Sequence, residues 1–356
     1  MSATSVPEPS NPDSSPSSSK GQAAGQSAST GNLLILIATC LLSGMAFMAL
    51  GMSLAPIWPG IPLVELMELL QGQPQKPPPS WEEIQALMAR AGYEVSQAAR
   101  TLFMVQGLTT FGFFVLPGLW FLQHRRDGRR PEQRHPLLPS VRQGPFLPVL
   151  LLPVAILLAY LPLIYNLYHL NLGIQLLPWS DSLMLELKGA EERAERMLQV
   201  MMEPDGTGFW FLGILVLALL PALGEEMVFR GCLQSLLGRL WGRPHAAIWV
   251  SALLFSAVHG QWLGFVPRCL LGAMFGYLFW HSGSLWTAVL AHFANNLYSF
   301  LGYRFKWMEN AAEGLSQGAA YVLTEWPVAW GWALGGAVMG TLCWYAWWML
   351  AAQNHE

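Results

Sequence analysis

The chain has 356 residues, of which 53% are hydrophobic and only 12% are charged. This composition is too apolar for an ordinary soluble domain, so we expect a protein embedded in membrane lipids. The formal net charge of −3 is nearly balanced, and the basic residues form no long stripe. Charge therefore gives no indication of nucleic acid as a partner.

Residues 1–31 consist mainly of Ser, Pro, Gly, Ala and Gln, and such a segment is predicted to be a disordered tail because it has little apolar surface to bury. Apolar runs of about 20 residues, long enough to cross a bilayer as a helix, follow in the remainder of the chain. The candidate spans are 33–57, 101–123, 145–166, 208–230, 245–260, 264–281, 284–301 and 328–350. We therefore predict an all-α fold, a polytopic transmembrane bundle of about eight helices over residues 32–350.

The orientation follows from the segment between the second and third spans, because cytoplasmic loops of membrane proteins are enriched in basic residues. This segment contains Arg125, Arg126, Arg129, Arg130, Arg134 and Arg142. We expect both termini to be cytoplasmic, in a bacterial inner membrane or, in a eukaryotic host, in the endoplasmic reticulum. The acidic segments 58–100 and 167–207 are expected to lie on the outer side. A helix with Ser80 as its N-cap is predicted in the first of these segments, whereas Arg304 and Lys306 do not fit the charge rule.

The stretch LGEEMVFRG, residues 223–231, places three charges at the end of an apolar span. A charge at membrane depth costs several kcal/mol unless it is paired, hydrated or neutralised. In a helix Glu226 and Arg230 are four residues apart on one face, so they can form an ion pair. Glu225 then has no partner within its own helix.

Two further spans carry polar groups on otherwise apolar helices: His259 follows Phe255 by four residues, and His292 precedes Asn296 by four. A carboxylate, imidazoles and an amide can activate water and stabilise an oxyanion, which is the chemistry of hydrolysis. Alternatively, Glu225, His259 and His292 are the ligand types of an open catalytic zinc site. A structural ion-pair network is the third possibility for the charged stretch.

In this order and spacing, EEMVFRG, FSAVH and GSLWTAVLAHFANN resemble the CPBP family of intramembrane proteases, which includes type II CAAX prenyl endopeptidases and bacteriocin-processing proteins. The family pattern is EExxxR, FxxxH and HxxxN/D on separate transmembrane helices. The matching positions are Glu225, Glu226, Arg230, Phe255, His259, His292 and Asn296. The resemblance covers about residues 208–300, which we take as the catalytic core.

The resemblance implies a helical membrane fold with a polar catalytic cavity and hydrolysis of a membrane-associated or prenylated protein or peptide. Glu225 would be the general base, His259 would help to activate water, and His292 with Asn296 would form the oxyanion site. Glu226 and Arg230 would support this geometry. The resemblance leaves open whether a divalent metal such as zinc takes part, because metal-free and metal-dependent mechanisms would use the same residues.

Two other classes of function use similar residues. A proton-coupled transporter could relay protons through buried Glu and His, although the chain shows no repeat-related halves. A non-catalytic scaffold or immunity protein could keep the same fold, but it would have no need of a carboxylate that activates water. The motifs favour the protease over both of these alternatives.

The predicted span boundaries raise a geometric difficulty for the protease. They place Glu225 near the inner end of the fourth span and His259 near the outer end of the fifth. The two side chains can meet if the fourth helix continues to about Leu240 at a steep tilt, or if it breaks at Pro221 beside a water-filled cavity.

Overall fold

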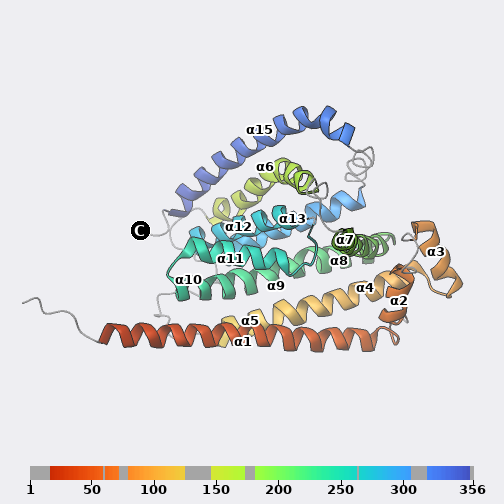
Figure 1. The fold of residues 1–356 in the computed structure, drawn as a ribbon, viewed down its shortest axis with the longest axis horizontal. Coiled ribbons are helices and arrows are strands. Elements are labelled where there is room, and N and C mark those ends of the chain that lie inside the picture. Colours follow the sequence, from red (N-terminus) through yellow and green to blue (C-terminus); the bar gives the residue numbers. More distant parts are fainter. Residues whose placement is uncertain are drawn as a thin grey trace, which may run out of the picture.

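The computed structural model describes residues 17–58, 61–71, 79–124, 146–172, 181–262, 264–305 and 319–352. Within these ranges every regular element is a helix and none is a strand, which confirms the all-α helical bundle (Figure 1). The arginine-rich segment between the second and third spans lies outside the described residues, as do residues 1–16 of the predicted tail.

Each predicted span corresponds to a helix or to a continuous helical run. In chain order these are α1 (Ser17–Leu54); α4 (Val95–Thr110), the π-helical η1 (Phe111–Val115) and α5 (Leu116–His124); α6 (Phe146–Leu172); α8 (Thr207–Gly213), η3 (Ile214–Leu219), α9 (Leu220–Glu226), η4 (Met227–Gln234) and α10 (Ser235–Trp241); α11 (Pro244–Ala257); α12 (Phe265–Ser282); α13 (Leu285–Arg304); and α15 (Ala319–Ala352). Among the described residues, 3 helical stretches are long and apolar enough to cross a membrane: Thr30–Leu54, Val95–Gln123 and Thr207–Trp241. These stretches indicate a membrane protein, and the total of about eight spans stays a prediction.

The first helix begins earlier than predicted. Because α1 starts at Ser17, the structure gives residues 17–31 as helical, whereas their composition predicted a disordered tail. The physical reason is the distribution of proline, which interrupts helices. Pro16 is the last proline before the apolar run, so a helix nucleated in that run can extend back through the Ser, Ala and Gln residues to Ser17.

The fourth helical run is longer than predicted, reaching Trp241 instead of residue 230. It ends at Gly242, whose positive φ of 63° places it in the left-handed region and whose N–H bonds to the carbonyl of Gly238. The run does not break at Pro221. The π-helical η3 immediately before it closes an N–H bond from Leu220 to Leu215, and this wider turn accommodates the proline.

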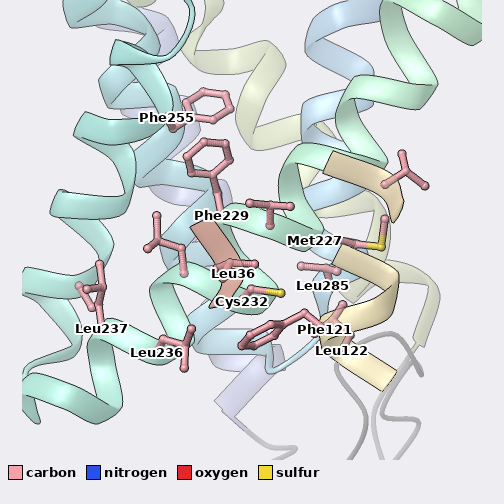
Figure 2. Packing of buried hydrophobic residues seen from close by; sticks show 14 of the residues in the cluster. Leu36, Phe121, Leu122, Met227, Phe229, Cys232, Leu236, Leu237, Phe255 and Leu285 are labelled. Carbon is pink, nitrogen blue, oxygen red and sulfur yellow. The ribbon is translucent and has the colours of Figure 1, made fainter. Parts of the chain in front are cut away.

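The helices that carry the motifs lie in the middle of the bundle. In Figure 1, α1 and the α4–α5 run pack along one face, α6 and α15 pack along the opposite face, and α9, α11, α12 and α13 lie between them. Figure 2 shows an apolar core in which Leu36, Phe121, Met227 and Leu285 come from four different helical runs. The charged residues of α9 are therefore surrounded by protein on several sides.

Three amphipathic helices, α2 (Leu63–Gln71), α3 (Trp81–Arg90) and α7 (Asp181–Met202), gather at one end of the bundle (Figure 1). Ser80 is the N-cap of α3, as predicted: its Oγ accepts a hydrogen bond from the N–H of Glu83 at 3.3 Å, and the Glu83 carboxylate accepts from the Ser80 N–H at 2.8 Å. Together these bonds form a capping box.

Arg304, which did not fit the charge rule, has a structural role at this same end. It donates to the carbonyls of Met202 and Pro204, and it forms a 2.7 Å ion pair with Asp205. Its guanidinium also lies 4.9 Å from the ring centroid of Trp210. These contacts tie the end of α13 to the joint between α7 and α8.

Candidate active site

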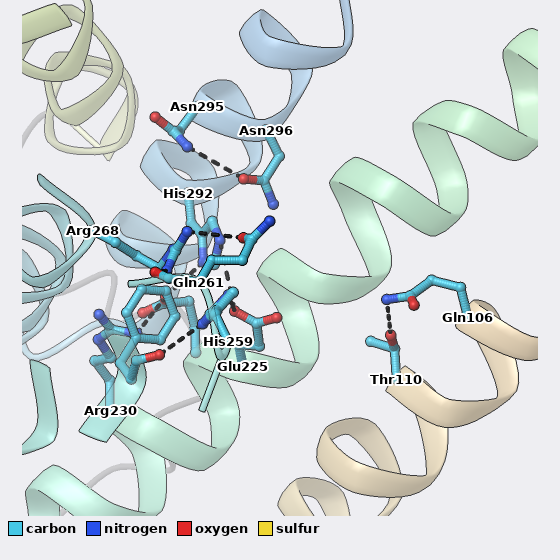
Figure 3. Close-up of polar contacts among 12 residues, drawn as sticks. Gln106, Thr110, Glu225, Arg230, His259, Gln261, Arg268, His292, Asn295 and Asn296 are labelled. Carbon is cyan, nitrogen blue, oxygen red and sulfur yellow. Dashed lines mark hydrogen bonds and ion pairs between the residues drawn. The ribbon is translucent and has the colours of Figure 1, made fainter. Parts of the chain in front are cut away.

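The structure brings the residues of all three motifs together (Figure 3). Glu225 lies 16 residues before Trp241, at the end of its helical run, and His259 lies 15 residues after Pro244, at the start of α11. The two helices run antiparallel, and the two residues are separated from the connecting turn by nearly equal numbers of residues. Glu225 and His259 therefore lie at the same level along the bundle. Continuation of the fourth helix to Trp241 thus resolves the geometric difficulty, and the steep tilt of this helix in the membrane stays a prediction.

Glu226 is fully buried and joins two other motif residues. Its Oε1 accepts hydrogen bonds from Arg230 Nη1 at 2.7 Å and from His292 Nδ1 at 2.8 Å. Arg230 also donates from Nη2 to the carbonyl of Gly272 in α12 at 2.8 Å. The predicted Glu226–Arg230 pair therefore forms, and it holds three helical runs together in a buried network.

Glu225 has a different environment from its neighbour. Its Oε2 lies 3.9 Å from the Nε2 atoms of both His259 and His292. This oxygen is buried and accepts no hydrogen bond from the part of the chain that the structure describes. Of the two adjacent carboxylates, Glu226 is thus bound into the scaffold, whereas Glu225 faces two imidazoles without being bonded to either.

The partners of the two imidazoles indicate where their protons lie. His259 Nδ1 is 2.7 Å from the carbonyl oxygen of Phe255, which can only accept, so Nδ1 carries a hydrogen. His292 Nδ1 donates in the same way to the Glu226 carboxylate. In the neutral form of each ring the Nε2 lone pair therefore faces Glu225. A hydrogen donor such as water can bridge this set of acceptors.

The same geometry bears on the predicted zinc ligands Glu225, His259 and His292. Tetrahedral zinc with bonds of about 2.0 Å places its ligand atoms about 3.3 Å apart. The Oε2 to Nε2 distances of 3.9 Å exceed this value, and no three His, Cys, Asp or Glu residues in the described ranges are arranged to hold a metal ion. The residues do not fit a metal as they are placed, and the predicted metalloprotease class is not supported.

The aromatic ring of Phe255, one helical turn before His259, packs against other residues of the site. The Arg230 guanidinium lies 4.6 Å from its ring centroid, and the rings of His259 and His292 lie at 5.1 and 5.7 Å, both edge-on. On its other side, His292 stacks on Phe275 at 5.0 Å. Both imidazoles are thus held by aromatic packing as well as by hydrogen bonds.

Helix α12 contributes to the site although no functional residue was predicted in it from the sequence. Gln234 Nε2 donates to the Gly276 carbonyl at 3.1 Å, one turn beyond the contact between Arg230 and Gly272. A Cβ atom at Gly276 would lie only 2.7 Å from Gln234 Oε1. The GxxxG spacing of these glycines is typical of close helix packing in membranes. This spacing could have indicated from the sequence that α12 packs closely against the site.

Two carbonyls of the π-helical η4, which contains Arg230, accept hydrogen bonds from serine side chains. Ser251 Oγ from α11 donates to the Phe229 carbonyl, and Ser235 Oγ donates to the Arg230 carbonyl, each at 3.0 Å. A π-helical turn frequently marks a functional site. Here it accompanies the network around Glu226.

Comparison with known proteins agrees with the three motifs. Residues 207–298 match the family model described as Rce1-like, type II CAAX prenyl endopeptidase. The chain is also 33% identical over 84 residues to an uncharacterized protein of Bacillus subtilis, YpbD, in an alignment that covers 22% of this chain and 40% of the length of YpbD. No solved structure matches the chain. The family resemblance is therefore confirmed for the part of the chain that carries the predicted site residues.

Proposed function

We propose that this chain, whose residues 207–298 match the Rce1-like family model, is an intramembrane endopeptidase with Glu225 as its general base. The observation that carries the proposal is the contrast between the two carboxylates. Glu226 is bonded to Arg230 and His292, whereas the buried Glu225 carboxylate faces two imidazole Nε2 atoms at 3.9 Å.

The proposed reaction begins with a water molecule that donates one hydrogen to Glu225 and the other to His259 Nε2. The oxygen of this water bonds to the carbonyl carbon of the substrate's peptide bond. At the same time Glu225 takes a proton from the water, and the π electrons of the carbonyl group move onto its oxygen. Asn296 donates a hydrogen bond to this oxyanion, and so does His292 whenever its Nε2 is protonated. The carbonyl then re-forms as the C–N bond breaks, and the amine leaves with the proton from Glu225.

The substrate we propose is a membrane-associated protein or peptide, with a prenylated C-terminus as the form to test first. Membrane lipids surround the enzyme, and we place it in a bacterial inner membrane with both termini cytoplasmic. The structure describes the site from α9 to α13 but not the arginine-rich segment from which this orientation was predicted.

The test compares wild type with Glu225→Gln, both purified in detergent, on a quenched fluorescent farnesylated peptide and on a peptide library from a membrane proteome. We expect Glu225→Gln to abolish cleavage, because an amide cannot take a proton from water. The matched control is Glu68→Gln, which removes an exposed carboxylate from α2 and should cleave like wild type.

A chelator added to wild type should leave cleavage unchanged, and loss with rescue by zinc would overturn the metal-free reaction. If wild type and Glu225→Gln give the same background on both substrates, the protease proposal is overturned. The scaffold and the transporter then become the leading functions.

A further inference from the structure

Two side-chain amides beside the reacting groups have their oxygens engaged by neighbouring donors. Asn296 Oδ1 accepts from Asn295 Nδ2 at 3.3 Å, and Gln261 Oε1 accepts from Arg268 Nη2 at 3.0 Å. Each amide therefore directs its NH₂ group away from that neighbour. In Figure 3 the amide nitrogens of Gln261 and Asn296 point toward one another, next to His259 and His292.

Gln261 is held firmly for a residue in a connecting segment. Gly260, with a positive φ of 65°, turns the chain directly after His259. Arg268, in the first turn of α12, then binds Gln261 twice, from Nη1 to its backbone carbonyl at 3.1 Å and from Nη2 to its side-chain oxygen. Because a guanidinium only donates, the amide atom facing Arg268 is the oxygen, and the nitrogen lies on the other side.

The proposed reaction needs such a donor. His292 uses Nδ1 to bind Glu226, and its Nε2 faces Glu225 at 3.9 Å. A neutral His292 therefore has no N–H to offer an oxyanion, and Asn296 alone would leave the developing charge with a single amide donor. Oxyanion sites are built from preorganised N–H groups in a site that excludes water.

We propose that Gln261 is a further catalytic residue, whose Nε2 binds the oxyanion together with Nδ2 of Asn296. Arg268 is the positioning residue that holds the Gln261 amide in this orientation. This inference rests on the proposed protease function and adds the second donor to its oxyanion site.

The decisive variant is Gln261→Glu, because it keeps an oxygen for Arg268 to bind and replaces only the NH₂ donor with a negatively charged oxygen. We expect kcat on the farnesylated peptide to fall by about 100-fold to 1,000-fold in Gln261→Ala and by at least as much in Gln261→Glu, with little change in KM. If Gln261→Glu keeps the wild-type kcat, Gln261 only anchors Arg268 and the inference is overturned.

Matched controls separate a catalytic role from a structural one. Gln97→Glu preserves the capping box of α4, which Gln97 forms with Glu94, and should leave kcat unchanged. A peptide aldehyde adds water to become a tetrahedral diol, so Gln261→Glu should weaken its inhibition while a non-cleavable peptide of the same sequence binds as before. Equal weakening of both ligands would show a loss of folding at the site and would overturn the catalytic assignment.

Arg268→Lys should lower kcat because a lysine ammonium cannot bind both oxygens of Gln261 in a fixed fork. Glu225→Gln in the same assay distinguishes the two proposals. If wild type cleaves and Glu225→Gln does not, the protease proposal stands, and the Gln261 variants alone decide the inference. If wild type does not cleave, the protease proposal fails first and the inference fails with it.

Discussion

Glu225 and Glu226 are adjacent, yet a step of about 100° around the helix axis gives them different partners. Glu226 meets Arg230 on its own helix and His292 on α13, and its charge is balanced there. Glu225 meets the two Nε2 atoms instead. In a membrane, where an unpaired charge is expensive, this separation agrees with our proposal that one carboxylate stabilises the site while the other reacts with water.

A first prediction at the residue scale concerns stability. Glu226→Leu leaves the buried Arg230 guanidinium without its carboxylate, so we expect it to lower the free energy of unfolding in detergent by about 3–5 kcal/mol. Glu225→Leu removes a carboxylate whose nearest charged or imidazole partners lie at 3.9 Å, not at hydrogen-bond distance, and it should change stability far less. Denaturant titration followed by tryptophan fluorescence measures both.

The double variant Glu226→Leu with Arg230→Met provides the complementary measurement. Replacing both members of a buried ion pair with apolar residues removes the unpaired charge, so most of the lost stability should return. Equal stabilities for Glu226→Leu and wild type would contradict the assignment of Glu226 as the structural carboxylate.

At the scale of single elements, the approach of α12 to η4 is decisive for the site. Gly272 and Gly276 present their carbonyls to Arg230 and Gln234 across a contact that has no room for side chains. The backbone of α12 thus serves as a row of acceptors for polar groups that would otherwise face an apolar interior. Helix α12 also begins with the turn that contains Arg268.

The prediction for this contact is that Gly276→Ala destabilises the protein by about 1–3 kcal/mol through overpacking. Its new Cβ would lie 2.7 Å from Gln234 Oε1 and 2.9 Å from Ile248 Cγ2. Gly335→Ala is the matched control, because no heavy atom lies within 4 Å of the corresponding position in α15. If thermal unfolding of the two variants is indistinguishable, the close contact does not hold in solution.

The motifs could be predicted from the sequence because charge in an apolar helix is conspicuous and spacing of four residues defines a helix face. The Glu226–Arg230 pair was predicted in this way and forms in the structure, and Asn296 was proposed from the same spacing. Gln234, Gln261 and Arg268 were not, because their partners lie on other segments and depend on where helices cross. The fourth span was predicted to end at residue 230 because the charged stretch interrupts its apolar run, although residues 231–241 are again largely apolar and Gly242 gives a local stop.

At the scale of the whole molecule, a 35-residue helical run from Thr207 to Trp241 sets the geometry. At 1.5 Å per residue its length is about 52 Å, which exceeds a hydrocarbon core of about 30 Å. Glu225 consequently lies well inside the run, and the shorter helix α11 is long enough to bring His259 to the same level. The amphipathic helices α2, α3 and α7 assemble where this run begins.

Arg304 gives the prediction at this scale, because it connects the end of α13 with the joint between α7 and α8. We expect Arg304→Met to lower the free energy of unfolding by about 1–3 kcal/mol, chiefly through its lost bonds to carbonyls, since Asp205 is exposed. Limited proteolysis at the joint should also accelerate. Arg90→Met, which replaces an exposed arginine at the end of α3, should behave like wild type. An unchanged rate of proteolysis in Arg304→Met would contradict the proposal that Arg304 holds the end of α13 against the joint between α7 and α8.

The π-helical η3 has a consequence for how the length of this chain can vary. A π turn amounts to one additional residue in an α-helix, and the one at Ile214–Leu219 lies between the start of the fourth run and the two glutamates. Because the wider turn accommodates this residue locally, deleting a single residue there would restore a regular α-helix, and the residues after it would keep their orientation relative to α8. Glu225 would then face the same neighbours as before. The length of this helical run can therefore change by one residue at η3 without turning the two glutamates away from the site.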